Sequence, residues 1–341
     1  MYSIDNELFI REELNGITIY NTIFNTYNFY EGCSISNFFD KYETLTRKNL
    51  YSYLNNYTET KNIKFKYPFR INWLVSDCCN LKCIYCFADN KLNFTGDNNV
   101  DYKRIVRNLL NYKPLCVGLT GGEPTLNPNL KNIISELCGR CAIIIDTNGT
   151  TQGLNMCLDL LRKSNATVRI TLDSVDDSII NIVRPYFKNS FEIIAQNIKQ
   201  LLDNNINVII HTVVTQKNIK FIPTIYDYIM DKKIVRWQLY PVCYTEKCKT
   251  IYNFIKVTDE ELEQLEEVLA DKNKNHIDIK IYRNKSDFSA RAVLMLDSRG
   301  NYFVDTIFNG IEYCGFDFKK PSIKELENSL DIKNHIDDYF N

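Results

Sequence analysis

Three cysteines with a distinctive spacing lie in the segment SDCCNLKCIYCF. Cys79, Cys83 and Cys86 form the array C-x3-C-x2-C, and Cys78 is out of register with it. Three thiolates on so short a loop suit one corner of a cubane iron–sulfur cluster, because the fourth iron then keeps an open position for chemistry. A structural zinc site normally takes four ligands, and no histidine follows closely here. We therefore interpret the three cysteines as ligands of a reactive cluster, with a zinc site or a group of core cysteines as the alternative.

Further polar residues follow later apolar segments of the chain. The segment TGGEP holds Gly121 and Gly122, which let the backbone approach a ligand closely, and Glu123, whose carboxylate can bind a cation. The segment at 146–149 reads DTNG, and the segment at 171–174 reads TLDS. In parallel α/β folds the loops after the carboxyl ends of the strands form the active site. We therefore expect these segments to gather around the cysteine loop.

Apolar segments of strand length alternate with helical patterns between Pro68 and Pro241. Strands are predicted at 70–75, 115–119, 142–145, 168–172, 208–214 and 235–240, and helices at 102–110, 130–137, 154–161, 193–202 and 222–230. Such alternation is typical of right-handed βαβ units, which build a parallel sheet covered by helices on one side. Eight units would close a full barrel. The six units found here predict an α/β fold with a partial (β/α)6 barrel.

Shorter modules flank this region. Leu8–Tyr30 is rich in β-branched and aromatic residues and is broken by Asn15-Gly16, which predicts two or three antiparallel strands before a helical pattern from Ser34 to Asn56. After Pro241 come an acidic helix whose first turn fits a capping box (Thr258 with Glu261), a hairpin around residues 299–300 and a terminal helix. The predicted organisation is a strand–helix, winged-helix-like module at 1–62, the barrel at 67–241 and an α+β extension at 242–341.

The composition limits the classes of partner. The chain has 341 residues, of which 45% are hydrophobic, and its 41 Lys and Arg against 42 Asp and Glu give a net charge of −1. This balance gives no support to a nucleic-acid or membrane-surface partner. The N-terminus lacks the basic start and apolar stretch of a signal peptide, and no segment reaches the ~20 apolar residues of a membrane helix. We expect a cytoplasmic protein whose 12 cysteines stay reduced.

The segment CNLKCIYC resembles the signature of the radical S-adenosylmethionine (radical SAM) superfamily, and the similarity extends over about Phe69–Pro241. The resemblance implies one [4Fe-4S] cluster bound by Cys79, Cys83 and Cys86, with S-adenosylmethionine (SAM) at the open iron. One-electron reduction, by a donor such as flavodoxin or ferredoxin, then yields methionine and a 5′-deoxyadenosyl radical that abstracts hydrogen from a substrate. The cofactors supply this chemistry, while the protein positions the groups and excludes water.

The resemblance also implies which residues contact SAM. Gly121, Gly122 and Glu123 match the GGEP motif, which holds the SAM ammonium group. Arg184 matches an arginine that pairs with the SAM carboxylate, although Pro185 stands where the family usually has glycine. The full implied set is Tyr85 (through its backbone, at adenine), Gly121, Gly122, Glu123, Thr147 (in the TNG turn), Thr171 (at the ribose or carboxylate), Asp173 and Arg184. No residue is assigned as a catalytic acid or base, and His211, alone on an apolar strand, is expected in the core.

The flanking modules carry resemblances of their own. The first 62 residues are similar to the PqqD-like element with which peptide-modifying enzymes hold a leader peptide as an added strand, and the alternative is a structural cap on the barrel. The C-terminal region resembles the SPASM or twitch extension, but Val304 and Asp305 stand where cluster cysteines would follow its hairpin. We therefore expect no auxiliary cluster, and Cys243, Cys248 and Cys314 stay unassigned.

Together these features predict a radical SAM maturase that abstracts hydrogen from a ribosomally synthesised precursor peptide. Its expected partners are that peptide, with its leader at the N-terminal module, and an electron donor; nucleic acid and membranes are not expected. The first alternative is a viperin-like nucleotide triphosphate dehydratase, which the stretch RWQLYPV and the C-terminal region without cluster cysteines favour. The second is a non-catalytic peptide-binding protein with a structural cluster. The bond formed and the oligomeric state are left open.

Overall fold

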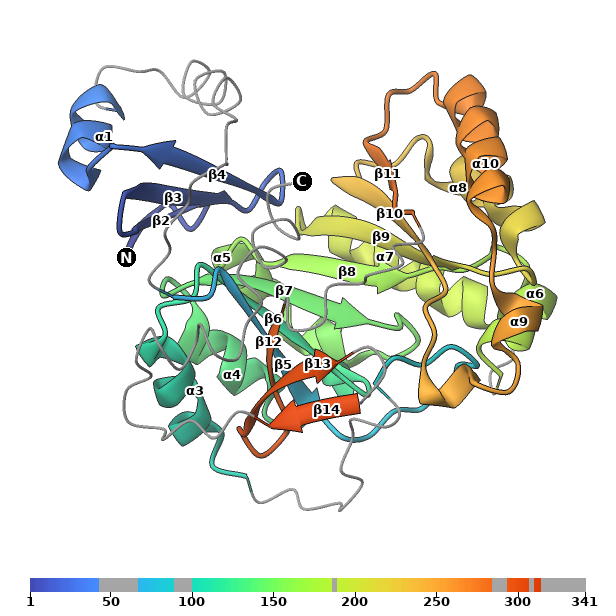
Figure 1. Cartoon of the computed structure of the whole chain (residues 1–341), viewed down its shortest axis with the longest axis horizontal. Helices are drawn as coiled ribbons and strands as arrows, with labels where there is room; N and C mark the ends of the chain where they lie inside the picture. Colours follow the sequence, from blue (N-terminus) through green and yellow to red (C-terminus); the bar gives the residue numbers. More distant parts are fainter. Residues whose placement is uncertain (43–66, 89–99, 186–188, 284–292, 307–309, 314–341) are drawn as a thin grey trace.

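The computed structural model describes residues 1–42, 67–88, 100–185, 189–283, 293–306 and 310–313. Within these residues the strands form two sheets, one of four strands at the N-terminus and one of ten. Figure 1 shows helices along one side of the larger sheet and the small sheet near one end of its strands. An α/β fold with a mostly parallel sheet and a separate N-terminal sheet confirms the predicted fold class.

The N-terminal sheet is a meander of four antiparallel strands. β1 (Tyr2–Ile4), β2 (Leu8–Glu12), β3 (Gly16–Asn21) and β4 (Thr26–Glu31) pair in sequence order, and α1 (Ile35–Tyr42) follows them. Three of these strands lie where the sequence predicts two or three. β1 is outside the predicted range, because three largely exposed residues show no strand pattern. The predicted helix beyond residue 42 lies outside the described residues, so the winged-helix resemblance stays a prediction.

Six parallel strands form the centre of the larger sheet in sequence order. They are β5 (Arg70–Ser76), β6 (Cys116–Gly121), β7 (Ala142–Thr147), β8 (Thr167–Thr171), β9 (Asn207–Val214) and β10 (Arg236–Pro241). The accompanying helices are α3 (Tyr102–Asn111), α4 (Leu130–Leu137), α5 (Leu158–Lys163), α6 (Asp177–Val183), α7 (Ser190–Asp203) and α8 (Ile222–Ile229). The six predicted strands are confirmed, with bounds that shift by at most two residues.

Two of the helices differ from the prediction. The segment predicted as a helix at 154–161 begins as a 3-10 helix, η2 (Gly153–Cys157), before α5. This turn packs tightly, since a Cβ atom on Gly153 would lie 2.5 Å from the carbonyl oxygen of Thr125. The sequence pattern does not predict α6, because its 7 residues are too few to show a helical period. Asp176 caps α6, with its side chain accepting a hydrogen bond from the Ser178 N–H at 2.8 Å.

The C-terminal residues lengthen the larger sheet at both edges. α9 (Tyr252–Ile255) and α10 (Asp259–Lys272) lead to β11 (Ile279–Ile281), which pairs in parallel with β10. At the other edge β12 (Leu294–Leu296) pairs in parallel with β5, and β13 (Tyr302–Thr306) and β14 (Gly310–Tyr313) follow in antiparallel order. The predicted hairpin and capping box are confirmed. The predicted terminal helix lies outside the described residues.

The two faces of the larger sheet differ because strand side chains alternate. Ile71, Trp73 and Ile210 are examples of the apolar side chains that pack under the helices. The opposite face, called the inner face below, carries polar side chains in its middle strands: Arg70, Asn72, Asp146, Arg169, Thr171, His211, Gln238 and Tyr240. A closed barrel fills its interior with layers of bulky apolar residues. The polar inner face is therefore a candidate surface for binding.

The N-terminal sheet packs across the start of these strands. One apolar cluster joins the two parts: Phe9, Tyr20, Phe29, Phe69, Leu115, Cys116, Ala142 and Ile144. Arg11 adds polar contacts, since its Nη2 donates to the Tyr67 carbonyl at 2.8 Å and its Nη1 donates to the Pro68 carbonyl at 2.9 Å. The parallel strands thus begin at the N-terminal sheet and end at the polar loops, with the inner face between them.

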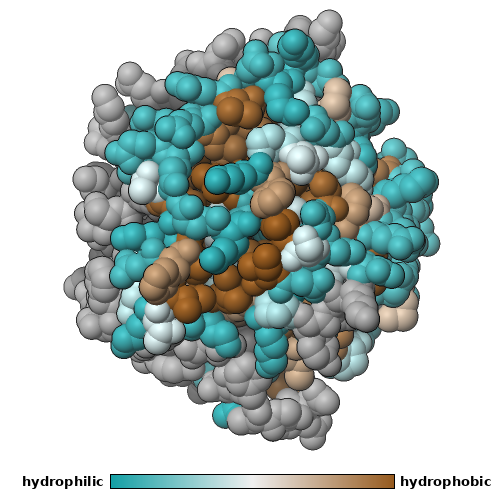
Figure 2. Space-filling view, turned by 90° about the vertical axis from the view of Figure 1, so that its right-hand side faces the viewer, coloured by the Kyte–Doolittle hydropathy of each residue, from teal (hydrophilic) through white to brown (hydrophobic). Residues whose placement is uncertain are grey.

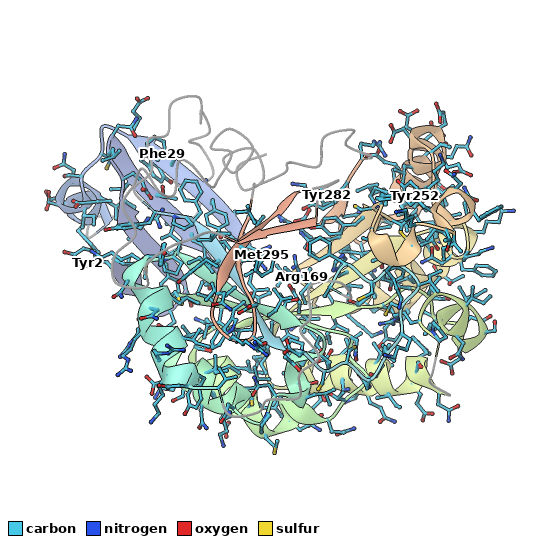
Figure 3. The ribbon with its side chains drawn as sticks, turned by 60° about the horizontal axis from the view of Figure 1, so that its bottom comes forward. Tyr2, Phe29, Arg169, Tyr252, Tyr282 and Met295 are labelled. Carbon is cyan, nitrogen blue, oxygen red and sulfur yellow. The ribbon has the colours of Figure 1, made fainter. Side chains whose placement is uncertain are left out.

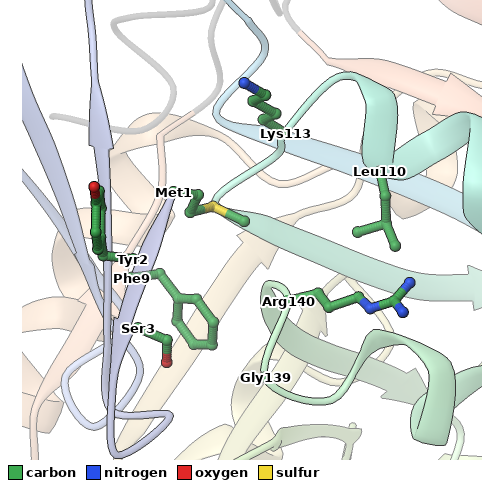
Figure 4. A pocket seen from close by; sticks show the side chains of 8 residues that line it. All are labelled: Met1, Tyr2, Ser3, Phe9, Leu110, Lys113, Gly139 and Arg140. Atoms are coloured by element: carbon green, nitrogen blue, oxygen red, sulfur yellow. The ribbon is translucent and has the colours of Figure 1, made fainter.

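The surface offers two further features. Figure 2 shows a face on which hydrophobic residues gather near the middle, surrounded by hydrophilic ones. Among the described residues, no helix is long and apolar enough to cross a membrane. A pocket of about 350 Å³ lies between the edge of the N-terminal sheet and the core, and Phe9, Lys113 and Arg140 are among its lining residues (Figure 4). Since Lys113 precedes β6 and Arg140 precedes β7, this pocket lies at the opposite end of the strands from the cysteine loop.

Candidate active site

The cysteine loop begins where β5 ends. The side-chain Oγ of Ser76 accepts a hydrogen bond from the Cys78 N–H at 3.2 Å and donates to the Cys78 carbonyl at 3.1 Å. Farther along, the Cys86 N–H donates to the Cys83 carbonyl at 3.3 Å. Cys79, Cys83 and Cys86 are partly buried and lie outside any disulfide. The loop that carries the three predicted ligands therefore starts directly at the end of the first parallel strand.

Gly121 and Gly122 bring the end of β6 against the start of this loop. A Cβ atom on Gly121 would lie 2.5 Å from the Ser76 carbonyl oxygen, and the φ angle of Gly121 is +127°, which other residues rarely adopt. A Cβ atom on Gly122 would lie 2.2 Å from the Cys78 carbonyl oxygen. The N–H groups of Gly122 and Glu123 donate to these two carbonyls, each at 2.7 Å. The glycines thus position the cysteine loop, a role that the sequence motif alone does not reveal.

The Glu123 carboxylate joins the end of β6 to the end of β7. It is fully buried, and its Oε1 accepts hydrogen bonds from Thr125 Oγ1 at 2.6 Å and Thr147 Oγ1 at 2.7 Å. Its Oε2 accepts from the Asn148 N–H at 2.8 Å. Burial raises the pKa of this carboxyl, and the hydrogen bonds from Asn148, Thr125 and Thr147 oppose the shift. Two predicted SAM contacts, Glu123 and Thr147, are therefore bonded to each other.

Two asparagines that the sequence reasoning missed tie the turn after β7 to the cysteine loop. Asn148 Nδ2 donates to Asn80 Oδ1 at 2.9 Å and lies 3.9 Å from the Cys79 sulfur. Asn80 Nδ2 in turn donates to Thr150 Oγ1 at 2.9 Å. The available signal was an amide residue inside each of the two motifs, CNLKC and TNG. These bonds fix the loop from a second side.

Asp173 and Arg184 form a buried ion pair beside the loop. Their side chains are 0% and 1% exposed, and Arg184 Nε lies 3.2 Å from Asp173 Oδ2. The Tyr85 hydroxyl also donates to Asp173, and the Val213 N–H donates to Asp173 Oδ1 at 2.9 Å. Burial raises the pKa of Asp173, and Arg184 opposes that shift. Three residues of the predicted set, far apart in the sequence, thus contact one another.

One end of the Arg184 guanidinium has no partner in the described part of the chain. Nη1 donates to the Asn148 carbonyl at 3.3 Å, whereas Nη2 is buried and forms no hydrogen bond there. Burial alone would lower the pKa of Arg184, but Asp173, Tyr85 and the nearby Cys83 raise it. A buried donor without a partner costs about 1–3 kcal/mol or more. The site therefore offers a positively charged donor, next to the cysteines, for an anionic acceptor.

Thr171 and His211 lie next to each other on the inner face, in register between β8 and β9. The Thr171 side chain forms no hydrogen bond within the described ranges, so it stands apart from the network around Glu123. His211, which was expected in the core, is partly buried and lies on the inner face of the sheet rather than under the helices. Its strand position points inward, where its partly buried ring lies 4.6 Å from the Tyr240 ring. Burial and the charge of Arg169 lower the pKa of His211 to about 3.

Part of the chain matches a family model. Residues 73–229 match the model of the radical SAM superfamily. These residues form a radical SAM domain. The matched range contains the cysteine loop, the GGEP segment and Arg184, so the residues that predicted the family lie inside the match.

Curated proteins that are similar to part of this chain carry different names. Fe-coproporphyrin III synthase from Methanosarcina barkeri is 23% identical over 60% of this chain and 51% of its own length. The antilisterial bacteriocin subtilosin biosynthesis protein AlbA from Bacillus subtilis is 29% identical over 47% of this chain and 36% of its own length. An S-adenosylmethionine-dependent nucleotide dehydratase from Flammeovirga pacifica is 25% identical over 50% of this chain and 62% of its own length. The chain thus spans about half the length of the first curated relatives, and the domain alone does not identify a substrate.

Solved structures extend the likeness beyond the radical SAM domain. Streptococcus suis SuiB bound to precursor peptide SuiA superposes with a TM-score of 0.68 and 16% identity, covering 98% of this chain and 90% of that chain. SuiB bound to S-adenosylmethionine gives a TM-score of 0.66 with 18% identity, covering 96% of this chain and 88% of that chain. At such low identity the likeness shows a shared fold that includes both flanks.

The donor set of the cysteine loop fits a cubane cluster, which takes cysteine thiolates as its ligands. Among the described residues, no three His, Cys, Asp or Glu side chains come together in the way a single ion requires. In a cubane cluster each cysteine binds a different iron, so the three sulfurs do not converge on one point. Burial raises the pKa of Cys79 and Cys83. Thiolates at these positions therefore need nearby positive charge, which cluster iron supplies, while Arg184 opposes the shift at Cys83.

Cys248 lies close to the radical SAM loop. Its hydrophobic cluster includes Ile84 and Tyr85 from the cysteine loop. The buried sulfur of Cys248 accepts hydrogen bonds from the Thr245 N–H at 3.2 Å and from Thr245 Oγ1 at 3.3 Å. Its contacts are thus those of a local turn, and Cys314 lies outside the described residues. The expected absence of an auxiliary cluster stays a prediction.

Proposed function

We propose that the chain is a radical SAM enzyme that reductively cleaves S-adenosylmethionine to a 5′-deoxyadenosyl radical and abstracts hydrogen from a ribosomally synthesised precursor peptide. The observation that carries the first part is the buried, unpaired Nη2 of Arg184 beside the cysteine triplet. The second part is supported by the fold likeness over 98% of the chain to SuiB, whose solved structure contains a precursor peptide. The similarity to AlbA, a bacteriocin biosynthesis protein, supports it as well.

In this proposal Cys79, Cys83 and Cys86 bind a [4Fe-4S] cluster, which together with SAM supplies the electron transfer and radical chemistry when bound. Arg184 Nη2 binds the SAM carboxylate. Its Nε faces Asp173, so the guanidinium is oriented before the ligand arrives. The Tyr85 hydroxyl is also bonded to Asp173, and the Tyr85 backbone would contact adenine, as the family resemblance implies.

Glu123 has two roles in the proposed site, one for each carboxylate oxygen. Its Oε1 holds Thr147, and its Oε2 accepts one hydrogen bond, from the Asn148 N–H, within the described residues. A carboxylate oxygen can accept a second bond, so Oε2 has capacity for the SAM ammonium group. Gly121 and Gly122 allow the backbone to come close, and Thr171, at the end of β8, completes the proposed SAM site. Asp173 is then a positioning residue that acts through Arg184.

The flanking modules would bring the macromolecular partners. The N-terminal sheet has two edge strands, β1 and β4, and an extended leader peptide can add to such an edge by main-chain hydrogen bonds. The electron would come from a donor such as flavodoxin or ferredoxin. A protein from a short open reading frame beside the gene is the natural candidate for the precursor.

Anaerobic reconstitution tests the proposal directly. The cluster-loaded protein with SAM and dithionite is expected to form 5′-deoxyadenosine, and adding the precursor peptide is expected to give a product of changed mass. An intact cluster without 5′-deoxyadenosine would refute the enzyme proposal and favour a structural cluster. Formation of 5′-deoxyadenosine that responds to the peptide would support the maturase.

A nucleotide triphosphate dehydratase is the second candidate. The similarity to the dehydratase from Flammeovirga pacifica over half the chain favours it. Under this alternative CTP or another nucleoside triphosphate, rather than a peptide, would stimulate 5′-deoxyadenosine formation. Running both additions side by side separates the two candidates.

A further inference from the structure

Two arginines and one aspartate lie close together on the inner face. Arg169 on β8 and Asp146 on β7 form a two-pronged ion pair, with Nε 2.5 Å from Oδ1 and Nη2 2.7 Å from Oδ2. Arg70 on β5 approaches the same carboxylate, with its Nη2 3.8 Å from Oδ2. Two guanidinium groups therefore face one carboxylate. The two-pronged pair with Asp146 holds the Arg169 guanidinium in a fixed orientation.

Arg169 has donor capacity left after binding Asp146. Its Nε and Nη2 are used, and Nη1 forms no hydrogen bond within the described part of the chain. The side chain is 15% exposed, so this nitrogen is open to a small ligand group rather than sealed in the core. Figure 3 shows Arg169 and Tyr282 on the side of the sheet away from the helices.

The position of Arg70 depends on a missing side chain. A Cβ atom on Gly118 of β6 would lie 2.5 Å from Arg70 Nη2 and 2.3 Å from Asn72 Oδ1. Arg70 Nε donates to that same Asn72 oxygen at 2.7 Å. Glycine at 118 thus lets the guanidinium lie across β6 toward Asp146 on β7. The two arginines and the aspartate thus come from β5, β7 and β8.

An aromatic and amide wall stands beside the arginines. The His211 ring packs edge-on against Tyr240, and Tyr240 stacks on Tyr282 at 4.0 Å with an interplanar angle of 10°. Neither ring nitrogen of His211 forms a hydrogen bond within the described ranges, and burial with the charge of Arg169 keeps the pKa of His211 at about 3. Gln238, next to His211 in register, donates to the Tyr282 hydroxyl at 3.2 Å, but the other end of its buried amide has no partner there. The wall is neutral and can contact an uncharged part of a ligand.

This surface lies directly below the proposed SAM site. Asp146 precedes Thr147 in β7, and Arg169 is two residues before Thr171 on the same face of β8. Two residues along a strand span about 7 Å. A ligand group held by Arg169 would therefore place the atoms next to it within reach of the end of the sheet where the radical would form.

We propose that Arg169, supported by Arg70 and the His211–Tyr240–Tyr282 wall, binds a carboxylate of the substrate peptide on the inner face. The carboxylate belongs to an Asp or Glu side chain or to the peptide C-terminus. This inference rests on the proposed function only in assigning the ligand to the peptide substrate. A single open guanidinium end matches a carboxylate, whereas a triphosphate needs more donors than this surface presents.

Small matched probes test the binding chemistry without the precursor. Saturation-transfer NMR on the cluster-loaded, SAM-bound protein compares N-acetylglutamate N-methylamide with its glutamine counterpart, and N-acetylalanine with N-acetylalaninamide. The first pair represents a side-chain carboxylate and the second a C-terminal one. In at least one pair the carboxylate is expected to bind about tenfold more tightly or better, as a charged hydrogen bond allows.

Three variants test whether Arg169 causes the preference for carboxylate over amide. Arg169→Gln is expected to abolish the preference for carboxylate over amide. Asp146→Asn is expected to strengthen carboxylate binding severalfold, because Arg169 loses its internal competitor. Arg162→Gln is the matched control, since Arg162 pairs with Asp159 on the exposed surface of α5, and it is expected to leave probe binding and SAM cleavage unchanged. Circular dichroism and iron content verify the folding of each variant.

The outcomes separate this inference from the proposed function. Equal binding of carboxylates and amides, no detectable carboxylate binding, a preference that survives Arg169→Gln, or binding of CTP alone would each overturn the carboxylate site, even if SAM cleavage proceeds. Failure of SAM cleavage with an Arg169-dependent carboxylate preference would overturn the enzyme proposal and leave the site standing. The opposite signs expected for Arg169→Gln and Asp146→Asn keep the test decisive if one variant folds poorly.

Discussion

Replacing Arg184 by methionine tests whether one buried guanidinium serves both the fold and SAM. Arg184 and Asp173 are 1% and 0% exposed, so Arg184→Met leaves a buried carboxylate without its cation. Removing one partner of a buried pair typically costs about 3–5 kcal/mol. Since Asp173 keeps its bonds from the Tyr85 hydroxyl and the Val213 N–H, we expect the lower end, about 3 kcal/mol.

The double variant Arg184→Met/Asp173→Asn separates the two roles. It removes both charges, so we expect it to recover roughly 1–2 kcal/mol of the stability lost in Arg184→Met. It does not restore the Nη2 donor, so SAM affinity is expected to stay about 10- to 100-fold below that of the unmodified protein. Stability thus recovers while SAM affinity does not.

Two measurements complete this test. Urea unfolding of the cluster-free chain reports stability through Trp73 and Trp237, both of which are buried in the core of the larger sheet. Equilibrium dialysis on the reconstituted protein reports SAM affinity. Unfolding of Arg184→Met at the same urea concentration as the unmodified chain would refute the assigned ion pair. A double variant with normal SAM affinity would refute the ligand role of Nη2.

Three other changes have defined outcomes. His211 is expected to stay neutral down to about pH 4 in an NMR titration, because its folded pKa of about 3 lies below the unfolded value of 6.5. The free energy of unfolding should therefore fall by up to about 1.4 kcal/mol per pH unit as the pH drops from 6.5 toward 3. The variant His211→Asn should flatten this pH dependence. Gly122→Ala should lower the iron content after reconstitution, because its Cβ would lie 2.2 Å from the Cys78 carbonyl oxygen. The control Gly32→Ala has open space around it and should bind iron normally, despite the local cost of its φ of +67°. Equal iron loss in both variants would contradict the packing argument. Thr258→Ala should cost about 1 kcal/mol in urea unfolding through loss of the α10 cap while SAM cleavage continues, and a large loss of cleavage would show that α10 matters to the site.

The main strands and the motifs at their ends were predictable because both leave local patterns. Apolar segments of five to eight residues mark β5 to β10, and the motifs TGGEP and DTNG follow two of them directly. The short strands were harder. β11 and β12 have 3 residues each, and nothing in three residues indicates that they join the two edges of the main sheet.

The internal partners of the site residues were not predictable in the same way. Arg184 forms an ion pair with Asp173, and Tyr85 forms a hydrogen bond with Asp173, which is 88 positions away in the sequence. Both contacts exist only because the ends of β5, β8 and α6 converge. The polar inner face was missed for a related reason. Asp146, Arg169 and His211 each stand alone among apolar neighbours in sequence, and only the strand register places them side by side.

The location of the N-terminal sheet sets a minimum length for any peptide that contacts both ends of the larger sheet. β5 runs for 7 residues from Arg70, beside the N-terminal sheet, to Ser76, at the cysteine loop. An extended chain covers at most about 3.3–3.6 Å per residue, as a strand does, so a peptide crossing the inner face needs at least as many residues as β5 itself. A peptide anchored at the N-terminal sheet would therefore offer for reaction only residues about seven or more positions from its anchored segment. The length of the sheet thus sets the distance between the anchored segment and the modified residue. Deleting residues between the two should move the modification to a later residue of the peptide or abolish it.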